Sequence, residues 1–421
     1  MTHVRTLFLA KALPGPHVDG YVVRNRGLLT RLGEMGEVDL LAYEEGAVPA
    51  FLRSSLRKVV TVPHGAPQRD SFIRRTREAL SSDSLFLRIG SFRDAIRDLC
   101  AETDYDIVWV GGWMMLQYVP DVRLHSRAKI VADPADDDIR SLEIDRAKAK
   151  SAVQRTRLWR DIVRFKRYEA KYLTGADIAL YVSSVDAGTT QRRQPDMRIE
   201  VSQNGVNTDA FAPATQPVTD PVFVFEGTMS FAPNVEGAVH FVGDILPLIQ
   251  AELPGAKVIL VGRNPVPEVQ TLASSTVEVT GTVDDVRESV LRGAIFVSPL
   301  LGGVGQKNKI LQAWSMALPI VSTPISVSGL DARDGDNLLL AKSAPAFAEA
   351  CVKLARSPGL RAALARSGRE TALEVYSVKR KLDETEALIR QLLAGQADAS
   401  GPTTAPSSDD ALRRSRRLGA P

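Results

Sequence analysis

Cysteine, histidine and aromatic residues are scarce in this chain of 421 residues, which has two cysteines, five histidines and 6% Phe, Trp and Tyr. Cys100 and Cys351 each lie in a stretch with the pattern of an amphipathic helix, and neither has another Cys or His at the spacing of metal ligands. This excludes a disulfide framework and a zinc motif, and it is typical of a reducing compartment.

The chain also lacks an excess of charge of one sign and a long hydrophobic run. Lys and Arg number 53 against 50 Asp and Glu, which gives a formal charge of +3. That balance argues against nucleic acid as a partner. No run approaches the roughly 18 apolar residues of a membrane span, and the first apolar run is too short for a secretory signal. We therefore expect a cytoplasmic protein.

What the chain does contain is enough apolar sequence for two cores. It is 44% hydrophobic and 24% charged, and its length fits two domains of about 200 residues each with a cleft between them. Short apolar runs alternate with helical stretches, the signature of buried parallel strands. The sequence predicts an α/β fold with two Rossmann-like domains. The runs cover 4–10, 38–43, 58–63, 105–110, 129–132 and 177–182, then 222–227, 257–262, 277–281, 294–299 and 319–323.

The two series of strands are separated by residues 202–221, which are rich in Pro, Asn, Asp and Thr and lack apolar periodicity. This composition indicates a turn and a linker. We predict an N-terminal domain over 1–215 and a C-terminal domain over 216–376. Residues 395–421 have too few large apolar side chains to pack, so we expect a disordered tail.

The stretch GGVGQKNKILQAW, from Gly302 to Trp314, combines three glycines and two lysines with the start of a helix. Ligands of open α/β sheets bind beyond the carboxyl ends of the strands, where this loop lies. Glycines let backbone amides approach an anion, and a helix N-terminus carries partial positive charge. The loop predicts an anion cradle. Its groups are the amides of Gly303, Val304, Gly305 and Gln306, the cations Lys307 and Lys309, and the polar helix face of Asn308, Lys309, Gln312 and Ser315.

Several segments of the second half resemble the retaining glycosyltransferases of family 4, whose two facing Rossmann-like domains form the GT-B fold. These segments are FEGTMSFAPNVEGAVHF (225–241), VILVGRNP (258–265), VEVTGTVDDVRESV (277–290), the stretch from Val297 to Leu330, and DGDNLLLA (334–341). In the first half Asn204-Gly205-Val206 resembles the interdomain turn of the family.

The resemblance implies transfer of a sugar from a nucleotide diphosphate sugar, UDP- or GDP-linked, without a required metal. The C-terminal domain would hold the donor, and a final helix over 377–394 would cross back to the N-terminal domain. The acceptor would be a glycan or a lipid-linked saccharide. A diphosphate is also the anion that Lys307, Lys309 and the loop amides suit.

Two departures from the family pattern weaken the resemblance. The family carries two glutamates separated by seven residues, and the matching positions here are Val304 and Gln312. Gln312 can still hydrogen-bond a ribose hydroxyl, whereas Val304 cannot replace a carboxylate. Many members also have Arg and Lys after the first strand of this domain, where this chain has Gly227-Thr228-Met229-Ser230.

Other candidates in the C-terminal domain each have a structural alternative of comparable weight. Arg263 either contacts phosphate or is a surface residue at a strand end. Gly227 either lets the backbone approach the donor or serves a tight turn. Thr282 and Val283 either contact the base or form a strand-to-helix turn. For Asn234 we favour the plain role of a helix N-cap.

Candidates in the N-terminal domain are fewer. Asp133, at a strand end, is placed to meet an acceptor hydroxyl, or it is a turn residue. His17 lies in the first loop, although a lone His is usually not catalytic. Asp136, Asp137 and Asp138 resemble a metal-binding acidic triplet, but without further ligands we interpret them as a solvated loop or helix cap.

The segment 153–173 carries seven Arg or Lys and an apolar stripe at helical spacing. A basic amphipathic helix can lie on an anionic membrane, which would place the protein on the cytoplasmic face of the inner membrane. An ordinary core helix shows the same stripe, and we favour it.

The sequence thus predicts a glycosyltransferase of cell-surface polysaccharide biosynthesis. One alternative is a degenerate member of the fold that binds a nucleotide sugar or glycan as a scaffold. Another is a sugar-nucleotide epimerase or hydrolase, which would need an acid/base pair that the sequence does not reveal. The base, the sugar, the linkage and the oligomeric state stay open.

Overall fold

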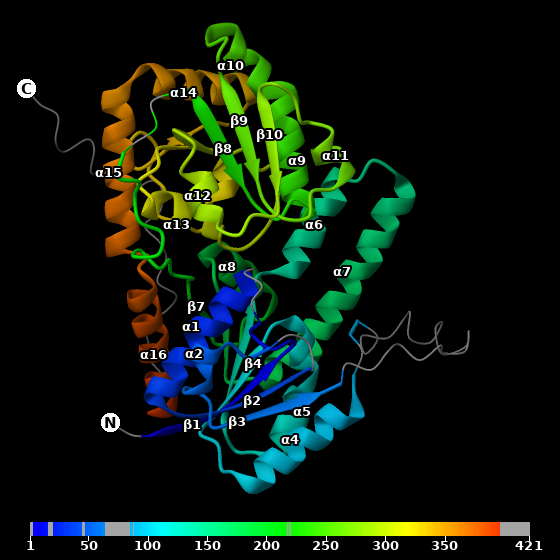
Figure 1. The fold of residues 1–421 in the computed structure, drawn as a ribbon. Coiled ribbons are helices and arrows are strands. Elements are labelled where there is room, and N and C mark those ends of the chain that lie inside the picture. Colours follow the sequence, from blue (N-terminus) through cyan, green and yellow to red (C-terminus); the bar gives the residue numbers. More distant parts are fainter. Residues whose placement is uncertain are drawn as a thin grey trace, which may run out of the picture.

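The computed structural model describes residues 3–395 except 16–19, 44–46, 64–84, 87, 217 and 219. Two all-parallel sheets lie one above the other, each between layers of helices (Figure 1). The first sheet has the strand order β3-β2-β1-β4-β5-β6-β7. Its strands are β1 (Val4–Ala10), β2 (Gly36–Tyr43), β3 (Lys58–Val62), β4 (Ile107–Gly111), β5 (Lys129–Ala135), β6 (Ile178–Tyr181) and β7 (Ile199–Val201). Its helices are α1 (Gly20–Met35), α2 (Ala50–Arg53), α4 (Gly90–Glu102), η2 (Trp113–Tyr118), α5 (Val119–His125), α6 (Asp138–Lys148), α7 (Ala152–Tyr172), η3 (Leu173–Gly175) and α8 (Ser184–Arg193).

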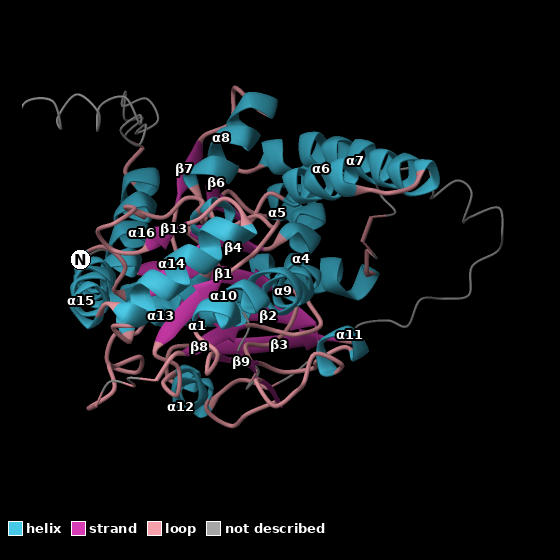
Figure 2. Ribbon diagram, turned by 90° about the horizontal axis from the view of Figure 1, so that it is seen from above, coloured by secondary structure: helices cyan, strands magenta, loops and turns pink. Residues whose placement is uncertain are grey.

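The second sheet has the order β10-β9-β8-β11-β12-β13. Its strands are β8 (Val222–Glu226), β9 (Lys257–Val261), β10 (Val277–Gly281), β11 (Ile295–Ser298), β12 (Ile320–Ser322) and β13 (Leu339–Leu340). The helices are α9 (Ala232–His240), η4 (Phe241–Ile245), α10 (Leu246–Glu252), α11 (Pro267–Gln270), α12 (Val286–Val290), α13 (Asn308–Ser315), η5 (Pro324–Val327), α14 (Ala344–Arg356), α15 (Pro358–Glu374) and α16 (Val378–Leu393). Figure 2 shows both sheets and their helices from above.

Burial explains why the apolar runs became strands. All five residues of β4 and all four of β11 are buried, because helices cover both faces of each sheet. The predicted α/β class with two Rossmann-like sheets is therefore confirmed. The strands β7 and β13 were not predicted, because they are only three and two residues long and the solvent reaches part of each.

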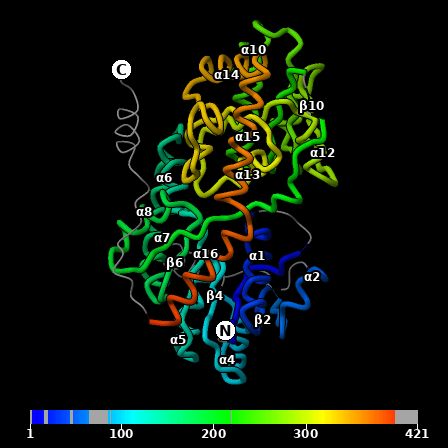
Figure 3. Tube along the Cα trace, turned by 90° about the vertical axis from the view of Figure 1, so that its left-hand side faces the viewer, coloured from blue at the N-terminus to red at the C-terminus, as the bar shows by residue number. Residues whose placement is uncertain are grey.

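Helix α16 links the end of the chain to the first sheet. It follows α15 of the second domain and continues down beside α1 (Figure 3). Ile389 and Leu392 of α16 belong to the same buried cluster as Phe8 of β1 and Leu29 of α1. The expected crossing of the last helix back to the N-terminal domain is confirmed, because the apolar face of α16 finds its core there.

Each sheet reverses its strand order at one point, and ligands of such sheets bind beside it. In the first sheet β1 and β4 are neighbours, and in the second sheet β8 and β11 are neighbours. Gly227 follows β8, and the glycine-rich loop follows β11. The fold thus brings the two predicted donor loops of the C-terminal domain to one place.

Helix α7 contains the predicted basic segment, and its two halves differ. Ile162, Tyr168 and Tyr172 of the second half are buried, whereas Val153 and Trp159 of the first half are exposed. The second half is a core helix, as the sequence favoured. None of the helices in the described part of the chain has the length and apolar character to span a bilayer.

Replacing Ile389 by alanine should lower the free energy of unfolding by about 2–5 kcal/mol, because the side chain is 3% exposed and its loss leaves a cavity. Urea titration followed by circular dichroism measures the change. Arg380→Ala is the control in the same helix, because its ion pair with Glu384 is exposed and should contribute less than about 0.5 kcal/mol. Equal effects of the two changes would show that the packing of α16 on the first sheet is unimportant.

Candidate functional site

The glycine-rich loop between β11 and α13 owes its shape to two glycines. Gly303 and Gly305 have φ angles of 111° and 71°, which residues with a side chain rarely adopt. Helix α13 then begins at Asn308, with Lys307 as its N-cap. The loop therefore has the predicted path from strand to helix.

The loop is docked on the N-terminal domain. The Gly305 amide donates a hydrogen bond of 2.8 Å to Oδ2 of Asp186, which lies in the first turn of α8 and is fully buried. A Cβ at Gly305 would collide with the carboxylate of Asp136. One of the amides predicted for phosphate is therefore bound to a carboxylate of the other domain.

The turn after β7 holds the other side of the loop. Gln306 accepts from the backbone amide of Asn204 at 2.7 Å and donates to its carbonyl at 3.1 Å. The Asn204 side chain donates to Oδ1 of Asn308 at 3.2 Å. Gln306 and Asn308, predicted as donor ligands, thus make contacts between the domains.

Lys307 bends back over its own loop. Its ammonium donates to the carbonyls of Val304 and Gly305, the latter at 3.0 Å. Burial lowers the pKa of Lys307, and the negative charges of Asp136 and Asp186 oppose that shift. Lys307 therefore faces two carboxylates of the N-terminal domain.

Lys309 lies at the carboxyl end of β8, beside Gly227. Its Nζ donates to Oδ1 of Asn234 at 2.7 Å and lies 4.5 Å from the centre of the Phe225 ring. A Cβ at Gly227 would lie 2.7 Å from Nζ, so a side chain at this position would displace the ammonium. Burial lowers the pKa of Lys309 to about 8, with the charge of Glu226 opposing the shift.

Asn234 is not the N-cap that the sequence suggested. Helix α9 begins at Ala232 after Phe231, and Asn234 uses its side chain to bind Lys309 and to donate to the Thr228 carbonyl at 3.0 Å. The Pro at the start of the helix moves the cap upstream, since proline favours the first turn.

The remaining C-terminal candidates surround this point without hydrogen bonds from their side chains to described residues. Arg263 and Gln312 are half-buried, and so is Val283, whereas Thr282 is exposed after β10. Gly262, just before Arg263, packs its backbone against the carbonyl of Gly227, so a side chain at Gly262 would collide with it. The ends of β8 and β9 are thereby held together.

Asp133 is 3% exposed at the end of β5 and is not free to meet an acceptor. Both of its oxygens accept from Arg24 of α1, at 2.9 Å at the shortest. Arg24 also donates to the Ser202 carbonyl at 2.8 Å and to the Asn204 side chain at 3.1 Å. The geometry gives Asp133 a role in holding α1 and the interdomain turn. His17 lies outside the described residues.

In the acidic triplet after β5, Asp137 is fully buried and Asp136 and Asp138 are half-buried, so the expectation of a solvated loop was wrong, while that of a helix cap is confirmed for Asp137. Asp137 accepts from the Arg140 amide at the start of α6, and Arg193 binds both of its oxygens at 2.9 and 3.0 Å. Burial raises the pKa of Asp136 to about 6 and that of Asp138 to about 7. Among the described residues no cluster of three or more His, Cys, Asp or Glu could hold a metal.

The backbone before Asp136 is strained. Ala135 has φ of 67°, unusual for a residue with a side chain. This turn directs the Asp136 carboxylate against Gly305, and no hydrogen bond to that carboxylate comes from the described residues. Such strain concentrates at functional positions.

The sequence did not point to Asp186 or Glu226 as members of the site, and Asn234 was interpreted as a helix cap. Asp186 looks like an ordinary residue of a first helical turn, and no motif marks its reach to the other domain. Glu226 was visible as a charged residue at the end of an apolar strand beside a candidate glycine, which could have signalled it.

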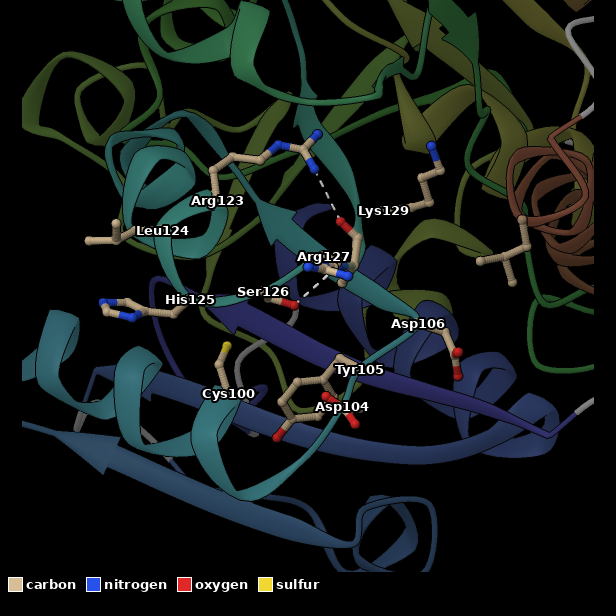
Figure 4. A pocket seen from close by; sticks show the side chains of 12 residues that line it. Cys100, Asp104, Tyr105, Asp106, Arg123, Leu124, His125, Ser126, Arg127 and Lys129 are labelled. Carbon is tan, nitrogen blue, oxygen red and sulfur yellow. Dashed lines mark hydrogen bonds between the residues drawn. The ribbon is translucent and has the colours of Figure 1, made fainter.

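A cavity of about 760 Å³ lies elsewhere, at the amino ends of β4 and β5 (Figure 4). Its basic side chains Arg123 and Lys129 are paired with Asp177. The edge of the sheet where it lies is opposite to the one where ligands of such folds bind. The candidate site is therefore the loop and its surroundings.

Two facing Rossmann-like domains joined by a crossing helix define the GT-B architecture of glycosyltransferases. Residues 220–357 match the family model described as "Glycosyl transferases group 1". This match covers most of the second Rossmann-like domain, and it contains Gly227, Lys307 and Lys309.

Known proteins resemble this chain in part of its sequence or in its fold. A 143-residue stretch is 25% identical to a Klebsiella pneumoniae protein named "Uncharacterized 44.6 kDa protein in cps region", and it covers 32% of this chain and 37% of that protein. Sucrose-phosphate synthase from Thermosynechococcus elongatus has a similar structure, with a TM-score of 0.68 and 17% identity over 93% of this chain and 100% of that one. The structure of Anabaena Alr3699/HepE in complex with UDP and glucose is also similar. Its TM-score is 0.65, and it is 13% identical over 92% of this chain and 100% of that one. At such low identity, the similarity to these two structures shows the fold alone.

Replacing Asp137 by asparagine should destabilise the N-terminal domain by roughly 1.5–3 kcal/mol, because the half-buried guanidinium of Arg193 loses one of its charged partners, whereas an asparagine can still cap α6. Thermal and urea unfolding measure it. Asp145→Asn on the exposed side of the same helix is the control and should change little. An unchanged stability of Asp137→Asn would contradict the structural role.

Proposed function

We propose that this protein is a glycosyltransferase that moves a sugar from a nucleotide diphosphate sugar to a glycan or lipid-linked saccharide in the assembly of a cell-surface polysaccharide. The observation that carries the proposal is Lys309, a half-buried cation between Gly227 and Asn234 at the switch point of the second sheet. The group 1 match over this domain supports it. The cps-region name of the Klebsiella relative supports the polysaccharide setting.

The donor would lie across the carboxyl ends of β8 and β11. Its diphosphate would take the place near Lys309, Gly303 and Lys307, and Arg263 is free to reach it. UDP is the favoured nucleotide because it is bound in the Anabaena structure. Gln312, Thr282 and Val283 would meet the ribose and base. No residue of the described chain calls for a metal in this arrangement.

The reaction would proceed with retention, as the family 4 resemblance implies. The bond between the anomeric carbon and the diphosphate oxygen breaks, and a bond to the acceptor oxygen forms on the same face. The acceptor proton passes to the leaving phosphate oxygen. Negative charge grows on the diphosphate as the bond breaks, and fixed cations stabilise that charge more than the ground state.

The N-terminal domain would present the acceptor. Asp136 is its best-placed polar group, because its carboxylate packs against Gly305 and accepts no hydrogen bond from the described residues. Reaching the cradle would require the domains to part, since the loop is held by Asp186 and Asn204. Hinge motion about 202–221 and 375–380 would allow this and would exclude water on closure.

Two alternatives use the same site. A scaffold protein would bind the nucleotide sugar or glycan without turnover, and Val304 and Gln312 in place of glutamates favour it. An epimerase or hydrolase would need an acid/base pair at the sugar. Asp136, with its pKa raised to about 6 by burial, is one titratable group for such a role.

Calorimetric titration of the protein with UDP, GDP and ADP should show that one of these nucleotides binds. The Lys309→Ala change should lower the affinity for that nucleotide at least tenfold, because a half-buried cation is lost from the diphosphate site. Affinity should fall as pH rises through about 8. The pKa of Lys309 is lowered to that value, so the ammonium is charged below pH 8 and neutral above it.

Lys257→Ala is the control, because this lysine is exposed at the start of β9, at the other edge of the sheet. Binding that Lys309→Ala leaves unchanged would refute the cradle. If no nucleotide binds, the proposal of a nucleotide-sugar donor is refuted, and the alternative of a scaffold that binds glycans remains.

A peripheral place on an anionic membrane is a further part of the proposal. The first half of α7 exposes Val153 and Trp159 at 82% and 52%, next to Arg157 and Arg160. Trp is suited to the interface of a bilayer, and arginines attract anionic lipid. The surface would hold the enzyme beside a lipid-linked acceptor on the cytoplasmic face.

Trp159→Ala combined with Arg157→Gln should reduce co-sedimentation with vesicles of phosphatidylglycerol severalfold, because both the apolar anchor and a charge are removed. Vesicles of phosphatidylcholine should bind neither protein. Leu124→Ala, at a residue 73% exposed on α5, is the control. Equal binding by the double variant and the control would exclude this face as the membrane surface.

A further inference from the structure

Glu226 is a carboxylate at the centre of the candidate site to which the proposed function has given no role. It is the last residue of β8, beside β11 at the switch point of the sheet, and it precedes Gly227. Its side chain is half-buried, and no described residue donates a hydrogen bond to it. A carboxylate withdrawn from water normally has several donors, so its free acceptor positions need an explanation.

The neighbouring lysine does not satisfy those positions. Burial raises the pKa of the Glu226 carboxyl, and the positive charge of Lys309 opposes that shift. The ammonium donates instead to Asn234, 2.7 Å away. A buried pair of charges that is not completed by hydrogen bonds recovers little of its desolvation cost. The arrangement is therefore poor as a structural ion pair.

The side chain faces the helix that carries the loop. Alternate residues of a strand share a face, and Val224, two residues before Glu226, packs with Ile310 and Leu311 of α13. Phe225 packs on the opposite face. Glu226 thus lies on the α13 side, which also bears Gln312, a half-buried side chain without a hydrogen bond to described residues.

We propose that Glu226 is a specificity-determining residue that binds a pair of neighbouring hydroxyl groups of the donor. Each carboxylate oxygen accepts one O–H, and vicinal diols are the groups that two such acceptors fit. Ribose and the transferred sugar both offer this chemistry. The inference rests on the proposed function, because it assumes that a nucleotide sugar occupies the site.

The rival role is electrostatic, in which Glu226 only keeps Lys309 charged. The two roles differ in the ligands that they affect. If the role is electrostatic, its loss changes the affinity for every anion that Lys309 binds, including pyrophosphate. If the role is recognition of hydroxyl groups, its loss changes the affinity only for ligands that carry the diol.

The test uses the full chain, wild type and Glu226→Gln, which keeps shape and removes the charge. Calorimetry measures binding of pyrophosphate, of UDP, GDP and ADP, of their 2′-deoxy forms and of UDP-glucose, ADP-glucose and GDP-mannose. Glu278→Gln is the matched control, a glutamate on β10 whose exposed carboxylate pairs with Arg292. Thermal unfolding checks that each variant folds.

We expect Glu226→Gln to weaken binding of the diol-bearing ligand at least tenfold, because a hydrogen bond to a charged group is lost. Binding of pyrophosphate should weaken less than threefold. Weakening already seen with the nucleoside diphosphate, and absent with its 2′-deoxy form, assigns the ribose. Weakening seen only with the nucleotide sugar assigns the transferred sugar.

Equal weakening of pyrophosphate and the nucleotides overturns the inference in favour of the electrostatic role. Unchanged binding of every ligand by Glu226→Gln overturns it while the proposed function stands. Failure of the wild-type protein to bind any nucleotide overturns the proposed function, and this inference falls with it.

Discussion

The contact between the Gly305 amide and the Asp186 carboxylate is the interaction on which the arrangement of the two domains depends. It lies at the end of β11 on one side and the start of α8 on the other, and Asp186 is fully buried. Arg140 binds the second oxygen of Asp186 at 2.9 Å. Because a carboxylate without donors would be costly at this depth, the glycine-rich loop and α8 are held in one conformation.

The consequences of that contact extend through the site. With Gly305 held, the Asp136 carboxylate packs on the loop, and Lys307 folds over the carbonyls beside it. Asn204 then meets Gln306, and through Arg24 it is tied to Asp133. A loop that the sequence marks as a ligand cradle is thus also a contact surface between the domains. The Gly305 amide cannot serve both uses at once, which makes domain separation a requirement of any ligand that binds this amide.

The sequence predicted the fold well and the site in part, for physical reasons. Buried parallel strands appear as apolar runs, so eleven of the strands were visible, whereas the short edge strands β7 and β13 carry no such signal. The loop was visible because glycine at positive φ and lysines near a helix start are local features. The partners of the loop were not, since Asp186 and Asn234 are distant in sequence and only the fold brings them to Gly305 and Lys309. Asp133 was misjudged because a strand end looks accessible until Arg24 from α1 covers it.

The two lysines that the sequence grouped together differ in what surrounds them. Lys309 lies within one domain, held by Asn234 and Phe225, so its position does not depend on how the domains meet. Lys307 faces Asp136 and Asp186 of the other domain, and it would lose both negative neighbours when the domains part. Its charge would then be available to an incoming anion. When the domains close again, the same two carboxylates would lie near the bound diphosphate and would repel it unless Lys307 stays between them. The ammonium of Lys307 would therefore act in both states of the site. In the empty site it is a partner of the two carboxylates, and in the filled site it would screen the ligand from those carboxylates.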